Sequence, residues 1–178
     1  TVVGAALDSL ESDKPARNEE FQELRNIREA IDFVENTIGA EDPQSITPGF
    51  IREVQRIITQ DLTMDGSKTP GAWRTEPVKI LKSTHTPPEH VEIPALIQEL
   101  CEYISDGNEG KLDIIKIATV HHRFAAIHPF DNGNGRTARL LTYAMLVQTK
   151  FIDKTKRTVL NPSAIFCIDR QKYYDMLA

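Results

Sequence analysis

The part of the sequence best suited to chemistry is residues 127–141, IHPFDNGNGRTARLL, which join the end of one apolar helix to the start of another. The second helix is expected to begin with three small or polar residues, Gly133, Asn134 and Gly135. Glycines there allow a tight turn, while the unpaired N–H groups of the first helical turn face outward. Those amides and the positive end of the helix dipole favour a bound anion, so the pattern predicts a phosphate site.

Two arginines and a histidine flank this predicted phosphate site. Arg136 and Arg139 are three residues apart and share one helix face, where two guanidinium groups can hold a polyphosphate. His128 precedes the turn, and an imidazole with an ordinary pKa of about 6.5 can act as a general base at neutral pH. Phe130 is expected to point inward and fix the loop to the core. A base beside a phosphate cradle is what a nucleotidyl or phosphoryl transferase needs.

Helical spacing dominates the rest of the chain. Apolar residues recur at three- and four-residue intervals in the stretches 18–38, 47–58, 91–104 and 112–124. Thr47 followed by Pro48 is typical of an N-cap and a first-turn proline. The residues expected on the inner face of the helix after the motif are Leu140, Leu141, Ala144 and Met145. The pattern predicts an all-α protein of about seven helices.

One segment departs from helical spacing. Gly66, Pro70 and Gly71 interrupt the pattern, and residues 73–81, WRTEPVKIL, contain β-branched residues in rough alternation. We predict a small β-hairpin there. Pro77 cannot donate to a ladder, so its strand would lie at an edge.

Composition excludes several classes of protein. With 178 residues, 40% hydrophobic and 26% charged, the chain is predicted to be one ordinary globular domain. The net charge of -5 lacks the basic footprint of a nucleic-acid binder, and no run of about 18 apolar residues predicts a membrane span. Cys101 and Cys167 are isolated and are expected to be reduced, buried thiols, so we predict a cytoplasmic protein.

The motif resembles the signature of Fic proteins: His, any residue, Phe, any residue, Asp or Glu, Gly-Asn-Gly-Arg, and a second Arg two residues beyond. The matching positions are His128, Phe130, Gly133, Asn134, Gly135, Arg136 and Arg139. Residues 71–88 are similar to the family's segment that leads into a β-hairpin flap, and residues 169–177, DRQKYYDML, to the helix after the motif. The resemblance covers residues 18–178, with residues 1–17 as a lead-in, and we expect a catalytic core truncated at both ends.

The resemblance implies a compact Fic-type helical bundle with a small β-hairpin flap. It also implies a protein adenylyltransferase, which moves AMP from ATP to a Tyr, Thr or Ser hydroxyl of a target protein and releases pyrophosphate. His128 would deprotonate that hydroxyl, and the target would dock by main-chain pairing at the flap near Ile80–Lys82. The nucleotide-binding residues implied are Gly133, Asn134, Gly135, Arg136, Arg139 and, on the adenine side, Tyr174.

Where the family most often has Asp or Glu, this chain has Asn132. The resemblance assigns that position to a Mg²⁺ or Mn²⁺ ligand, and a neutral amide oxygen binds a hard cation more weakly than a carboxylate. Asp131 supplies a nearby charge. An alternative interpretation is therefore a weakly active or inactive nucleotide-binding regulatory module. Gly135 favours AMP transfer over the reversed nucleotide of Doc-like kinases, which carry Lys there; phosphocholine and UMP transfer stay open.

Two further patterns carry no site. His121 and His122 point apart on a helix, and no Cys or carboxylate completes a zinc tetrahedron with His128. Residues 105–110, SDGNEG, match the family's inhibitory string by letter, but we expect a turn there and place the inhibitory helix upstream of Thr1. The sequence leaves open the target and whether the chain forms a homo-oligomer.

Overall fold

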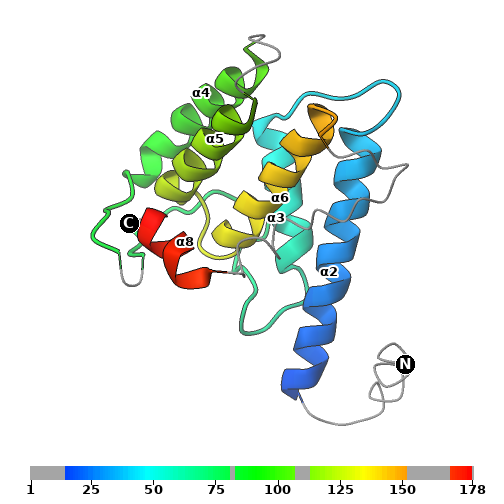
Figure 1. Ribbon diagram of the computed structural model, residues 1–178. Helices are drawn as coiled ribbons and strands as arrows, with labels where there is room; N and C mark the ends of the chain where they lie inside the picture. Colours follow the sequence, from blue (N-terminus) through cyan, green and yellow to red (C-terminus); the bar gives the residue numbers. More distant parts are fainter. Residues whose placement is uncertain (1–14, 81–82, 107–112, 152–168, 178) are drawn as a thin grey trace.

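The computed structural model describes residues 15–80, 83–106, 113–151 and 169–177 (Figure 1). The helices in these residues are α2 (Pro15–Thr37), α3 (Pro48–Thr59), the short 3₁₀ helix η2 (His90–Glu92), α4 (Ile93–Ser105), α5 (Asp113–Ile127), α6 (Asn134–Gln148) and α8 (Arg170–Leu177). The predicted all-α class is confirmed. No helix in the described part of the chain is both long and apolar enough to cross a membrane.

The start of α3 follows the prediction from the sequence. The Thr47 hydroxyl accepts a hydrogen bond of 3.1 Å from the Phe50 amide, and Pro48 occupies the first turn, where its missing N–H leaves no acceptor unpaired. The apolar face of α3 is buried against the core, and its C-terminal residue Thr59 lies beside the motif.

Helix α6 lies at the centre of the fold and packs against α2, α3 and α5 (Figure 1). Its predicted inner face is confirmed, since Leu140, Leu141, Ala144 and Met145 are all buried. Cys101 on α4 is also buried as a free thiol, and desolvation raises its pKa to about 12, so it stays protonated and unreactive. Cys167 lies outside the described residues.

A buried histidine joins the three helices α5, α6 and α8. The Thr142 hydroxyl donates to the Ala138 carbonyl, so it accepts at 2.8 Å from His121 Nδ1, and His121 Nε2 then accepts from the Tyr173 hydroxyl at 2.9 Å. Desolvation is the main cause that lowers the pKa of His121 to about 4. His121 is therefore a neutral structural residue.

The predicted β-hairpin is not seen, because residues 73–80 and 83–89 contain no strand. The Arg74 amide donates instead to the Pro129 carbonyl at 2.9 Å, which pairs this segment with the motif turn rather than with a neighbouring strand. Pro77, Pro87 and Pro88 have no N–H to give to a ladder. Leu81 and Lys82, at the predicted flap, lie outside the described residues.

Candidate active site

The turn between α5 and α6 depends on glycine at its last position. Gly133 is the N-cap of α6 and has a φ of 79°, in the left-handed region that side chains disfavour. A Cβ atom there would lie 2.7 Å from Cγ2 of Thr59. The end of α3 therefore determines how closely the turn can approach the core.

The turn is held to the core by an aromatic side chain and closed by an amide. Phe130 is fully buried, with its ring centroid 4.9 Å from that of Trp73 and 6.4 Å from that of Phe124. The Asn134 side chain donates to the Phe130 carbonyl at 2.8 Å and accepts from the Phe130 amide at 3.0 Å. With both polar ends engaged and only 4% of the residue exposed, the Asn134 side chain shapes the loop.

His128 has a strained backbone and a partly buried ring. Its φ is 50°, which is unusual for a residue with a side chain. Nδ1 lies 3.4 Å from the Ala125 carbonyl, and because a carbonyl only accepts, Nδ1 carries the proton and Nε2 keeps its lone pair. Burial is the main cause that lowers the pKa of His128 below 6.5, and nearby Arg74 and His85 act in the same direction. The ring is therefore neutral at pH 7, as a general base requires.

Arg74 holds His128 in place, a role that sequence reasoning missed. Its buried guanidinium donates through Nε to the His128 carbonyl at 2.8 Å and through its two terminal nitrogens to the Glu76 and Pro88 carbonyls at 3.0 and 2.6 Å. Three carbonyls around one cation join the 74–88 segment to the turn. The available signal was a charged residue directly after Trp73.

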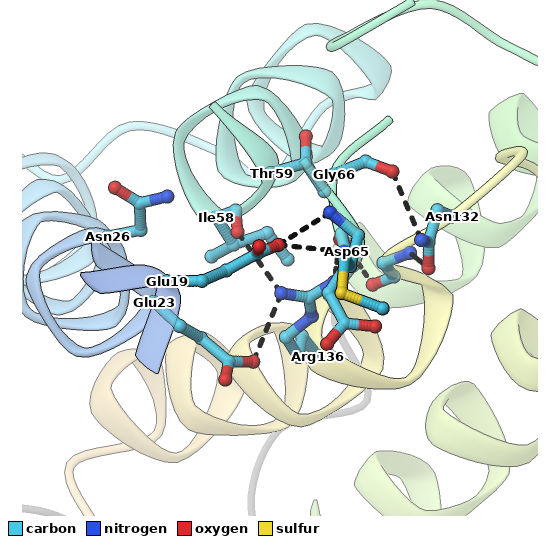
Figure 2. A network of polar contacts seen from close by, with 12 residues as sticks. Glu19, Glu23, Asn26, Ile58, Thr59, Asp65, Gly66, Asn132 and Arg136 are labelled. Carbon is cyan, nitrogen blue, oxygen red and sulfur yellow. Dashed lines mark hydrogen bonds and ion pairs between the residues drawn. The ribbon is translucent and has the colours of Figure 1, made fainter. Parts of the chain in front are cut away.

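Arg136 points away from the turn and toward α2. Its Nη1 donates to Glu23 Oε1 at 3.1 Å and lies 3.4 Å from the Ile58 carbonyl, while Nη2 donates to the Asp65 carbonyl (Figure 2). Only 12% of the side chain is exposed. The Arg136 guanidinium is thus engaged by other parts of the protein, and its phosphate-binding role stays a prediction.

The Arg139 side chain lies over the start of α6, whereas that of Arg136 faces α2. Nη1 of Arg139 lies 3.4 Å from where a Cβ on Gly135 would be, so the guanidinium extends back over the first turn of α6. Gly135 is exposed, and the N–H groups of that first turn have no acceptor within the helix. A cation and these amides are therefore brought to the same place, as an anion site requires.

Asn132 and Asp131 are both engaged in contacts within the protein. Asn132 Oδ1 accepts from the Gly133 amide at 2.7 Å, and its Nδ2 donates to the Gly66 carbonyl at 3.0 Å (Figure 2). The Asp131 carboxylate accepts from Ser67 Oγ at 2.5 Å, the Lys68 amide at 2.8 Å and the Asn132 amide at 2.8 Å. These contacts attach the 66–68 segment to the motif.

This arrangement does not fit a ready-made metal site. Within the described ranges no three His, Cys, Asp or Glu side chains come together in a way that could hold a metal ion. The amide oxygen of Asn132 is neutral and already accepts a hydrogen bond, and the carboxylate of Asp131 is occupied by three donors.

Comparison with known proteins identifies the family. The sequence model of the Fic/DOC family matches residues 45–146, more than half of the chain. The chain belongs to the Fic/DOC family. It is 29% identical over 160 residues to "Protein adenylyltransferase Fic" of Nematostella vectensis, covering 89% of this chain and 34% of that protein. It is 32% identical over 89 residues to a probable protein adenylyltransferase of Aquifex aeolicus, covering 49% and 27%.

Solved Fic structures share the fold. Fic-1 (residues 134–508) from Caenorhabditis elegans has a TM-score of 0.74 at 21% identity and is matched over 98% of this chain and 48% of that one. A Fic domain-containing signalling protein from Bacteroides thetaiotaomicron has a TM-score of 0.73 at 22% identity, over 96% and 61%. The chain spans about a third or less of the length of the two adenylyltransferases from Nematostella vectensis and Aquifex aeolicus.

Two residues outside the motif turn also bear on the site, Tyr174 and Gln55. Tyr174 lies on α8, but its side chain is outside the described part of the structure. Sequence reasoning also missed Gln55, a fully buried residue of α3 whose Nε2 donates to the Asn132 carbonyl at 3.0 Å and whose Oε1 accepts from the Gly71 amide at 2.6 Å. Gln55 thus fastens two loops of the Fic site, and a polar residue within the apolar pattern of α3 was its signal.

Proposed function

We propose that this domain transfers AMP from ATP to a hydroxyl of a target protein. The proposal rests on a neutral His128 that precedes α6, and on the first turn of that helix, where Arg139 lies close to Gly135 as an anion site would require. The names of the relatives, which are protein adenylyltransferases, support the same reaction. Because these relatives are about three times as long as this chain or longer, their targets and partners are not transferred to it.

The proposed step uses the lone pair of His128 Nε2. The target hydroxyl oxygen attacks the α-phosphorus of ATP, its proton passes to Nε2, and the bond to pyrophosphate breaks. The amides of Asn134 and Gly135 and the guanidinium of Arg139 bind phosphate oxygens and hold the nucleotide in line with the attack. The Gly133 amide contributes less, because it already donates to Asn132 Oδ1.

The finer expectations extend this proposal. The target segment would dock near Ile80–Lys82, a few residues after Arg74, which binds the His128 carbonyl. Tyr174 would line the adenine side, and Mg²⁺ or Mn²⁺ would enter with the phosphates of ATP. A cytoplasmic location follows from the expectation of reduced thiols and stays a prediction.

A second candidate is a nucleotide-binding module that does not turn over. It is favoured by the engagement of Asn132 Oδ1 with the Gly133 amide, which leaves the motif without a free acidic metal ligand. This candidate predicts ATP binding with no transfer of AMP.

One experiment separates the two candidates. The protein is incubated with α-labelled ATP and Mg²⁺ or Mn²⁺, and protein-linked AMP is detected by mass spectrometry, on this chain as well as on added proteins. His128→Ala should abolish the adduct and keep ATP affinity within about threefold, because the base acts on the hydroxyl and not on the nucleotide. ATP binding without any adduct in the wild type would instead favour the binding module.

A further inference from the structure

Two glutamates on one face of α2 reach a second turn, at residues 63–66. Glu19 and Glu23 are four residues apart and both extend toward residues 63–65 and α6 (Figure 2). Glu19 accepts from Thr63 Oγ1 at 2.6 Å, from the Met64 amide at 2.6 Å and from the Asp65 amide at 3.1 Å. The hydrogen bond from Thr63 is the main cause that lowers the pKa of Glu19, so the carboxylate is charged and holds the turn at neutral pH.

Glu23 reaches the same turn indirectly, through Arg136. The pair is 3.1 Å apart, with 12% of the Arg136 side chain and 35% of the Glu23 side chain exposed. A guanidinium this far from water is expensive to leave unpaired, so Glu23 fixes where Arg136 points. The other nitrogen of Arg136 donates to the Asp65 carbonyl, and the backbone of Asp65 is thereby held by α2 through its N–H and by α6 through its C=O.

The contact chain continues into the motif turn. The residue after Asp65 is Gly66, whose carbonyl accepts from Nδ2 of Asn132 at 3.0 Å. That bond orients the amide so that Oδ1 faces the Gly133 amide, at the N-cap of α6. Glu23 is therefore connected to the motif turn through Arg136, Asp65 and Asn132.

We propose that Glu23 is a positioning residue of this site: it holds Arg136 against the 63–66 turn, so that Arg136 orients Asn132 and Arg139 is left as the arginine that binds phosphate. This inference rests on the proposed function for its last clause. It gives the two motif arginines different roles, although their residue type and spacing alone suggest the same role. The contrast is visible in their surroundings, since Arg136 has an acidic partner and two carbonyls while Arg139 extends over Gly135.

The test compares four single variants by calorimetry with ATP and Mg²⁺, by transfer rate at saturating ATP, and by the NMR signal of the Asn132 side-chain amide. Arg139→Gln should weaken ATP binding about ten- to hundredfold, because a charge-assisted phosphate contact is lost. Glu23→Gln and Arg136→Lys should each leave ATP affinity within about threefold, shift the Asn132 signal, and lower the transfer rate about ten- to hundredfold through misplacement of the turn. Glu20→Gln is the matched control, the same change on an exposed position of α2.

A double variant tests the chain of contacts. Glu23→Gln combined with Arg136→Lys should lose no more rate than the worse single change, because both break one connection. Tighter ATP binding in Glu23→Gln would mean that Glu23 competes with phosphate for Arg136, and this result overturns the proposal. It is also overturned if Arg136→Lys loses as much ATP affinity as Arg139→Gln, or if the Asn132 signal stays unmoved.

The proposal and the proposed function can fail separately. A wild type that binds ATP and transfers no AMP removes the proposed reaction, while calorimetry and the Asn132 signal still decide the role of Glu23. Should Glu23→Gln fail to fold, Arg136→Lys keeps the charge at α6 and carries the same test.

Discussion

Replacing the glycine at the N-cap of α6 should damage the fold in two separable ways. Gly133→Ala forces a side chain into a φ of 79°, at a cost of about 1–2 kcal/mol. It also brings a Cβ within 2.7 Å of Thr59 Cγ2, and such overpacking costs about 1–3 kcal/mol. The sum, about 2–5 kcal/mol, is a large share of the stability of about 5–15 kcal/mol that native proteins have.

Thermal and urea unfolding give the magnitude. For a chain of this length the loss corresponds to a melting temperature about 4–20 °C lower. The matched control is Gly135→Ala, two residues away, where the new Cβ would lie at an ordinary 3.4 Å from Arg139 Nη1. That change should leave stability equal or raise it by up to about 1 kcal/mol, because alanine is the better helix former.

A change at Thr59 separates the clash from the backbone strain. Thr59→Ser removes Cγ2 and keeps a hydroxyl for the 2.8 Å bond to the Gln55 carbonyl. In the wild type it should cost about 0.5–1.5 kcal/mol, as deletion of a buried methyl does. In the Gly133→Ala background it should instead recover about 1–3 kcal/mol, while the φ penalty stays. Equal losses at the two glycines, or a serine that destabilises in both backgrounds, would refute the steric reasoning.

Three further outcomes follow from two histidines and one carboxylate. Native His121 has a pKa of about 4 against 6.5 when unfolded, so between these pH values the unfolded chain binds more protons. The contribution of His121 to the free energy of unfolding, up to about 3 kcal/mol, is complete above pH 6.5 and falls as the pH drops toward 4. This pH dependence should be missing from His121→Gln when urea unfolding is measured across the same pH range. The acid limb of the transfer rate should lie below pH 6.5, because burial lowers the pKa of His128; a rate still rising above pH 7 would contradict a neutral base. Asp131→Asn should lower the free energy of unfolding by about 1–3 kcal/mol, since the charged oxygens of Asp131 accept from Ser67 Oγ and from the Lys68 amide. An unchanged unfolding midpoint would mean that these two hydrogen bonds do not stabilise the protein.

The sequence by itself determined the elements with strong local signals. Apolar residues at helical spacing predicted α2 to α6, and the Thr47 cap with Pro48 predicted where α3 begins, because both features depend on neighbours within one or two turns. The motif letters also predicted a turn followed by a helix start, and this order is confirmed. These predictions need only the order and spacing of residues along the chain.

The predicted hairpin shows what local reasoning lacked. Residues 73–81 have β-branched alternation, yet the Arg74 amide pairs with the Pro129 carbonyl, 55 positions along the chain. Propensity for a strand is weak and context-dependent, so a distant acceptor can decide the outcome. The guanidinium of Arg74 makes the same kind of interaction, because it donates to the His128 carbonyl, 54 positions along the chain.

Only the tertiary structure decided which motif side chains are engaged by distant parts of the protein. Arg136 and Arg139 have the same charge and share a helix face by their spacing, but Glu23 of α2 lies near one of them and Gly135 near the other. Asn132 likewise looks like a metal ligand by position, and its amide is engaged by Gly66 and Gly133. A side chain's direction depends on the partners that packing brings to it, and in this protein those partners come from helices and turns far away in the sequence.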